Sequence, residues 1–268
     1  MVERITPGGS ARNPRVALFD FDGTLSLIRS GWMDVMVPMM MEILLDLKTG
    51  ETTDQLRGIV GDFVWKLTGQ ETIYQMIALA DAVALRGGQP LAPIVYKKMY
   101  LDRLWEKIHG RIAELQKGAA PPDKYLVPGA RALLETLSER GMKMYLASGT
   151  DEPFMKEEAR LLDIDRYFNG GVYGALDDYQ SFSKGILIQR ILASAEFRGD
   201  EFLGIGDGYV EIEEVKNVGG VAVGVASLEP ECMAVDEWKR RRLIGVGADY
   251  IVPNFLCQDE LLSNLFPA

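Results

Sequence analysis

The sequence predicts an α/β protein, a doubly wound parallel sheet whose first strand is followed by an all-helical domain. Three observations lead to this prediction. A short apolar run, residues 15–19, has the composition of a buried strand. No other strand-like run follows until after residue 119. From there to the end of the chain, strand-like runs alternate with amphipathic segments of helical length, which is typical of βαβ units in a parallel sheet.

The individual elements follow in chain order. Residues 15–19 are rich in β-forming side chains and lie between a proline and a glycine. Residues 30–119 place apolar side chains three and four positions apart, and therefore predict amphipathic helices. We expect residues 1–29 and 120–268 to form the α/β core and residues 30–119 to form the helical domain. The later helices are predicted at 129–141, 152–164, 184–195, 208–219 and 236–247, and the later strands at 142–148, 170–175, 201–207, 221–226 and 248–253.

Composition narrows the classes of partner. The 268 residues carry a formal net charge of −10 at pH 7, which argues against nucleic acid or an anionic membrane as a partner. The two cysteines, Cys232 and Cys257, are too few for a disulfide framework and fit a reducing compartment. Residues 1–14 form a loose polar lead-in without the apolar centre of a signal peptide, and charges and a proline interrupt the apolar stretch 32–47. We therefore expect a cytoplasmic protein, and the sequence leaves the oligomeric state open.

Polar residues stand at the carboxyl ends of the predicted strands, the edge where open parallel sheets bind ligands. Aspartates from two distant strand ends would form an oxygen-only site, which suits Mg²⁺. The metal would neutralise their charge, while a lysine and a hydroxyl with nearby backbone N–H groups would hold one phosphoryl group. The residues concerned are Asp20 and Asp22 after the first strand, Ser148 and Gly149 after the second, Asp207 after a later strand, and Lys184 at the start of a helix.

The two aspartates of the first strand end need different tasks. Asp20 can attack phosphorus as a carboxylate nucleophile and form an aspartyl-phosphate. Asp22 can protonate the oxygen of the leaving group and later activate water, so it must be protonated when the substrate binds. A neighbouring carboxylate and partial burial both raise the pKa of a carboxyl group, and unequal environments would separate the two roles.

Four segments, in this order, resemble the motifs of the haloacid dehalogenase (HAD) superfamily of phosphohydrolases. They are "DFDGTL" from Asp20, "MYLASGT" from Met144, "SFSKG" around Lys184 and "FLGIGDGYVEI" from Phe202. The resemblance implies a Rossmann-like core with a helical cap of the C1 type. It also implies a Mg²⁺-dependent phosphatase that acts on a small phosphorylated metabolite, such as a sugar phosphate or a phosphoglycolate-like compound, through an aspartyl-phosphate.

The resemblance also assigns roles to single residues. The aspartate at position 22 favours a phosphatase or a phosphomutase within this superfamily. The fourth motif often carries a second aspartate where this chain has Glu211, so the place of Glu211 in the metal shell stays open. The implied catalytic residues are Asp20 and Asp22, the implied phosphate-binding residues are Thr24, Ser148, Gly149 and Lys184, and the implied metal site comprises Asp20, Asp22, Asp207 and Glu211.

Three other functions stay open. A phosphomutase of the β-phosphoglucomutase type would use the same motifs and return the phosphoryl group to a sugar phosphate. A non-catalytic phosphometabolite-binding protein would keep the fold without turnover. A phosphonate hydrolase would need a Schiff-base lysine from the helical domain, for which Lys66, Lys97 and Lys98 are available.

Specificity is expected to reside in the helical domain and the linker that precedes it. Residues 68–76, "TGQETIYQM", interrupt the helical periodicity with glycine and small polar side chains. We interpret His109 as a surface or interhelical residue and the basic run Lys239–Arg242 as a solvated helix face. The candidates for contact with the leaving group are Arg29, Trp32, Arg57, Gln70, Thr72 and Gln75.

Overall fold

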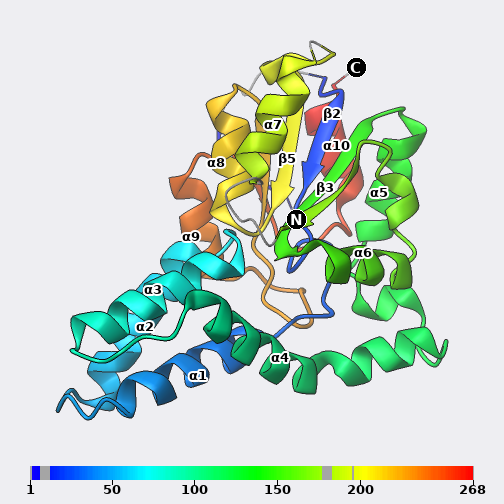
Figure 1. Ribbon diagram of the computed structural model, residues 1–268. Coiled ribbons are helices and arrows are strands. Elements are labelled where there is room, and N and C mark those ends of the chain that lie inside the picture. Colours follow the sequence, from blue (N-terminus) through cyan, green and yellow to red (C-terminus); the bar gives the residue numbers. More distant parts are fainter. Residues whose placement is uncertain (1, 7–12, 177–182, 195, 268) are drawn as a thin grey trace.

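A computed structural model describes residues 2–6, 13–176, 183–194 and 196–267. Its strands form a seven-stranded sheet in the order β1-β7-β6-β5-β2-β3-β4, with helices on both faces (Figure 1). All neighbouring strands are parallel except β1, which pairs antiparallel with β7 at the edge. The strands are β1 Glu3–Arg4, β2 Val16–Phe19, β3 Lys143–Asp151, β4 Gly171–Ala175, β5 Phe202–Gly206, β6 Val221–Val225 and β7 Tyr250–Val252.

The burial of β2 on both faces explains why residues 16–19 are all apolar. The strand lies between β3 and β5, and its four residues are fully buried. Ala17 and Phe19 pack into a hydrophobic cluster that includes side chains of helices α5 (Ala130–Glu139) and α10 (Gln258–Leu265). Val16 and Leu18 pack on the other face with side chains of α7 (Lys184–Ala193) and α8 (Tyr209–Asn217). A central strand covered on both faces must be apolar throughout, so its first charged residue marks its carboxyl end.

Five of the described core helices follow the predicted alternation, and the last one, at residues 258–265, was not predicted. The doubly wound parallel sheet predicted from the sequence is confirmed. The loose lead-in predicted for residues 1–14 is wrong where it is described, because Glu3–Arg4 forms the edge strand β1; residues 1 and 7–12 lie outside the described part of the chain. The core helices are α5 Ala130–Glu139, α6 Glu152–Leu161, α7 Lys184–Ala193, α8 Tyr209–Asn217, α9 Glu237–Gly245 and α10 Gln258–Leu265, with 3-10 turns at Pro122–Tyr125, Asp165–Tyr167 and Gly199–Glu201.

Four long helices between β2 and α5 form a bundle, here called the helical insert, at one end of the sheet (Figure 1). Their apolar faces pack against one another and continue into the core cluster of Phe19. The second helix begins with a capping box in which the Thr52 side chain and the Gln55 side chain each bond the other's backbone N–H. Within the described residues, none of the helices is both long and apolar enough to span a bilayer. The insert helices are α1 Met33–Leu45, α2 Thr53–Leu67, α3 Thr72–Leu85 and α4 Pro93–Gln116.

Candidate active site

A cavity of about 90 Å³ lies between the carboxyl ends of β2, β3 and β5 and the helical insert. Of the eight predicted site residues, five line it and three, Thr24, Lys184 and Glu211, lie buried immediately behind it. The core contributes Asp20, Asp22, Ser148, Gly149, Thr150 and Asp207, and the linker and insert contribute Arg29, Trp32, Met36, Thr68, Gly69, Gln70, Thr72, Gln75 and Tyr100.

Asp20 directly follows β2 and is only 6% exposed. Lys184 Nζ donates to its Oδ1 at 2.6 Å, and the Thr24 hydroxyl lies 3.4 Å from its Oδ2. Thr24 also accepts a hydrogen bond from the backbone N–H of Asp207 at 2.9 Å, so it joins two strand ends. Burial raises the pKa of Asp20 well above its usual value, and the charge of Lys184 opposes this only in part. An additional positive charge near Asp20 would therefore favour its ionised form.

Lys184 is the first residue of α7, which is capped by the Ser183 side chain. Its ammonium group bridges two carboxylates, Asp20 and Glu211, at 2.6 Å each. Burial alone would lower the pKa of Lys184, but the two carboxylates outweigh it and raise the pKa, so the lysine is charged. Lys184 is thus hydrogen-bonded to Asp20, the candidate nucleophile, and does not itself line the cavity.

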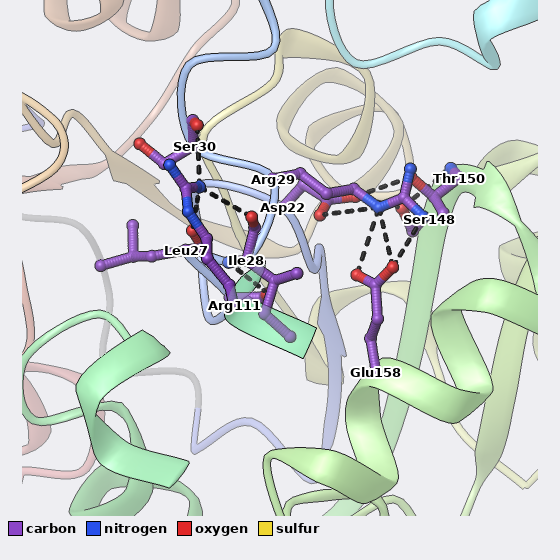
Figure 2. Close-up of polar contacts among 10 residues, drawn as sticks. Asp22, Leu27, Ile28, Arg29, Ser30, Arg111, Ser148, Thr150 and Glu158 are labelled. Atoms are coloured by element: carbon purple, nitrogen blue, oxygen red, sulfur yellow. Dashed lines mark hydrogen bonds and ion pairs between the residues drawn. The ribbon is translucent and has the colours of Figure 1, made fainter. Parts of the chain in front are cut away.

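Asp22 stands in a different environment from Asp20, as Figure 2 shows. The hydroxyls of Thr150 and Ser148 donate to its Oδ2 at 2.8 and 3.3 Å. Among the described residues its Oδ1 is buried without a hydrogen-bond partner, and the closest cation is Arg29 at 4.0 Å. Burial raises the pKa of Asp22 more than Arg29 and the hydroxyls lower it. A carboxyl group with a raised pKa and one uncommitted oxygen has the properties of a proton donor.

Arg29 is held in place from two sides (Figure 2). Its Nε and Nη2 both donate to the carboxylate of Glu158 on α6, with distances between 2.7 and 3.2 Å. Both side chains are almost fully buried. The backbone around Arg29 is held by Arg111 of α4. One nitrogen of Arg111 donates to the carbonyls of Leu27, Ile28 and Ser30, which lie in the linker between β2 and α1. The last insert helix thereby fixes the linker that carries Arg29.

Three carboxylates form a candidate metal centre: one oxygen each from Asp20, Asp207 and Glu211 lies within 4.8 Å of the others. Glu211 is fully buried; its Oε1 accepts the N–H of Gly208 at 2.8 Å, and its Oε2 accepts from Lys184. Lys184 and Lys239 are the lysines bonded to this cluster. An oxygen-only donor set with an excess of buried carboxylates fits a hard divalent cation such as Mg²⁺. Of the four residues predicted for the metal site, Asp20, Asp207 and Glu211 are therefore brought together where a metal ion would relieve their repulsion. The carboxylate of Asp22 is not part of this group.

The residues predicted to meet the leaving group fall into two sets. Arg29, Trp32, Gln70, Thr72 and Gln75 line the cavity. Arg57 does not, because it is exposed on α2 and pairs with Asp54 at 3.5 Å. None of the candidate Schiff-base lysines lines the cavity either: the buried Lys97 pairs with Asp151, Lys98 pairs with Asp102, and Lys66 is exposed on α2. His109 is exposed and contacts the carbonyl of Trp105 on its own helix.

Sequence reasoning missed several residues of the site. Thr150 is the last residue of the second motif as quoted above, so its position carried a signal. Tyr100, Glu158 and Lys239 carried none, because each reaches the site only through the packing of its helix. The interpretation of residues 239–242 as a solvated face is wrong for Lys239, which is 9% exposed and donates to Asp207 at 2.8 Å and to Glu229 at 2.9 Å.

Comparisons with known proteins show which proteins the chain resembles in sequence and in fold. Phosphoserine phosphatase of Bos taurus is 26% identical over 159 residues, which cover 54% of this chain and 69% of that protein. A phosphonoacetaldehyde hydrolase-like protein from Oleispira antarctica aligns with a TM-score of 0.61 at 16% identity over 95% of this chain and 93% of the other. A predicted phosphoglycolate phosphatase from Haemophilus somnus aligns with a TM-score of 0.55 at 15% identity over 93% and 98%. These two alignments show that the chain shares its fold with both structures.

A profile of the family described as haloacid dehalogenase-like hydrolase matches residues 14–219, which include the four motifs and the whole helical insert. The matched range begins just before β2 and ends just after α8, so it contains the described residues of the cavity and the three carboxylates of the candidate metal centre. The chain belongs to the haloacid dehalogenase-like hydrolase family, and it is a hydrolase.

Proposed function

We propose that this hydrolase is a Mg²⁺-dependent phosphatase that releases phosphate from a small phosphorylated metabolite through an aspartyl-phosphate on Asp20. The observation that carries the proposal is the unequal setting of two aspartates in one cavity. Asp20 is bonded to the charged Lys184, whereas Asp22 is bonded to hydroxyls and keeps one buried oxygen uncommitted. Such a pair provides a nucleophile and a proton donor in one cavity. The phosphatases among the similar proteins support this reaction class.

The proposed reaction uses the chain's own groups in two steps. In the first, an Asp20 oxygen attacks phosphorus and the bond to the leaving group breaks while Asp22 gives its proton to the leaving oxygen. In the second, Asp22 takes a proton from water as the water attacks phosphorus, and Asp20 leaves as a carboxylate. The Ser148 hydroxyl and the backbone N–H of Gly149 would bind phosphoryl oxygens. Mg²⁺ held by Asp20, Asp207, Glu211 and the Asp22 carbonyl would supply charge stabilisation for the phosphoryl group.

The small cavity limits the substrate that fits this arrangement. About 90 Å³ must hold the phosphoryl group and the atoms attached to it. The insert presents Gln70, Thr72 and Gln75 to this space, which favours a polar leaving group with hydroxyl or carboxyl groups. We therefore propose that the helical insert, residues 30–119, acts as a cap that selects a small polar phosphate monoester and excludes water.

A panel of phosphorylated sugars, nucleotides and small acids, monitored for inorganic phosphate with Mg²⁺, tests the proposal. We expect turnover of at least one small polar ester, loss of turnover in EDTA, and loss in Asp20→Asn with the fold unchanged. Asp54→Asn, on the exposed surface of α2, is the matched control and should retain activity. Full activity of Asp20→Asn would refute the mechanism, and an isomerised sugar phosphate without phosphate release would identify a phosphomutase instead.

A further inference from the structure

The basic run on α9 contacts the helical insert directly. The guanidinium of Arg242 donates hydrogen bonds to three carbonyls at the C-terminal end of α2: those of Trp65, Lys66 at 3.1 Å and Thr68 at 3.3 Å. Figure 1 shows α9 on the side of the sheet that meets α2 and α3. A residue of the core therefore binds the end of an insert helix.

The end of α2 has a physical need for such a partner. The last carbonyls of a helix lack intrahelical N–H donors and carry the negative end of the helix dipole. A planar guanidinium offers several N–H groups in fixed directions, so one side chain can reach several of these carbonyls. A lysine at this position would keep the charge but lose most of this geometry.

Aromatic rings fix the direction of Arg242. Its Cζ lies 4.5 Å from the ring centre of Tyr209 and 5.2 Å from that of Trp238. Trp238 in turn packs on Trp65 of the insert, with ring centres 4.3 Å apart. Tyr209 contacts the insert as well, through a hydrogen bond from Gln70 at 2.5 Å. The guanidinium therefore lies in a cluster built from both parts of the molecule.

The segment that follows these carbonyls, residues 68–70, lines the catalytic cavity. This segment packs so closely against Gly208 and Gly149 of the core that neither glycine could carry a side chain without a clash. A Cβ added to Gly208 would lie 2.9 Å from the Cα of Gly69, and one added to Gly149 would lie 2.6 Å from the carbonyl oxygen of Gln70. A displacement of this segment would therefore change the lining of the catalytic cavity.

We propose that Arg242 is a positioning residue that holds residues 68–70 over the catalytic cavity. One turn earlier on α9, Lys239 holds Asp207, so a single core helix connects the insert segment with a carboxylate of the candidate metal centre. The effect on turnover rests on the proposed function, whereas the effect on the position of the segment does not. Arg242 thus acts through Thr68, Gly69 and Gln70 and not on the substrate itself.

Hydrogen exchange of the full-length protein tests the positioning directly and needs no substrate. Arg242→Ala should raise the exchange rate of amides in residues 64–71 about tenfold, the factor that corresponds to ~1.4 kcal/mol, and leave the strands of the core unchanged. Arg242→Lys should give a smaller rise. Arg241→Ala is the matched control, because Arg241 is an exposed neighbour that bonds to the Glu237 carbonyl of its own helix. It should leave exchange in residues 64–71 unchanged.

Kinetics with whichever ester is turned over provide the second measurement. We expect Arg242→Ala to raise KM about tenfold with a smaller change in kcat, because a displaced segment loses contacts made equally in the ground and transition states. Partial recovery of KM is expected in Arg242→Lys. Unchanged exchange in residues 64–71 of Arg242→Ala, an equal rise in Arg241→Ala, or a rise spread over the core would overturn the proposal. A protein that turns over no ester but shows the local rise would refute the proposed function and leave the role of Arg242 standing.

Discussion

The buried pair of Arg29 and Glu158 allows a quantitative prediction. Replacing Glu158 by Ala removes a carboxylate that accepts three hydrogen-bond contacts from Arg29, at 2.7, 3.1 and 3.2 Å, and leaves the guanidinium charge buried. Loss of one partner from a buried ion pair costs ~3–5 kcal/mol of unfolding free energy. Asp22, 4.0 Å from Arg29, remains as a distant countercharge. We therefore expect a cost near the lower limit, about 3 kcal/mol.

A double-mutant cycle separates the ion pair from the loss of packing. The cycle compares Arg29→Met, Glu158→Leu and the variant with both substitutions. The double variant should cost less than either single one, because no unpaired charge is left behind. Urea unfolding followed by circular dichroism gives each free energy, provided that the denaturant slope is unchanged. Glu157→Ala, at the neighbouring exposed position, should stay within ~0.5 kcal/mol of the wild type. A cost below ~1 kcal/mol for Glu158→Ala, or additive effects in the cycle, would refute the reasoning.

Three further predictions concern the metal centre, the insert segment and the cysteines. Glu211→Gln should raise the Mg²⁺ concentration needed for half-maximal activity ~10–100-fold, and a magnesium titration that leaves it unchanged would exclude Glu211 from the metal centre. Gly69→Ala should lower kcat/KM about tenfold in steady-state assays, because the position has φ +95° and its Cβ would lie 3.1 Å from the Cα of Gly208; wild-type kinetics would contradict this packing. Burial raises the pKa of Cys232 to about 11, so only about one Cys232 thiol in a thousand is ionised at pH 8. Iodoacetamide should therefore label the half-buried Cys257 first, as followed by peptide mass spectrometry. The reverse order would be inconsistent with the burial of Cys232.

The elements that determine the fold were predictable because their signals are local. The unbroken apolar run 16–19 required a strand covered on both faces, and the charge that follows it marked the edge where ligands bind. The insert helices were equally clear, since α2 to α4 carry long amphipathic periods. The edge strand β1 was missed because a polar two-residue strand at residues 3–4 has no hydrophobic pattern of its own.

The core part of the candidate site was predictable because several of its residues lie at or near the carboxyl ends of strands. Asp20, Ser148 and Asp207 lie at strand ends, so the topology alone brings them together. Glu158 and Lys239 lie on helices whose orientation depends on packing over long sequence separations, and no spacing in the sequence pointed to them. Lys184 was predicted to hold phosphate, but the structure places its ammonium between two carboxylates. Its contact with phosphate stays a prediction.

Identification of the phosphorylated residue during turnover would decide whether Asp20 is the nucleophile. The enzyme would be mixed with a phosphate ester and Mg²⁺, quenched with acid within one turnover, digested and analysed by mass spectrometry. We expect one phosphate, released by hydroxylamine, on the peptide that contains Asp20, and none in Asp20→Asn. Phosphate on a different residue, or phosphate release by Asp20→Asn at the wild-type rate, would contradict it.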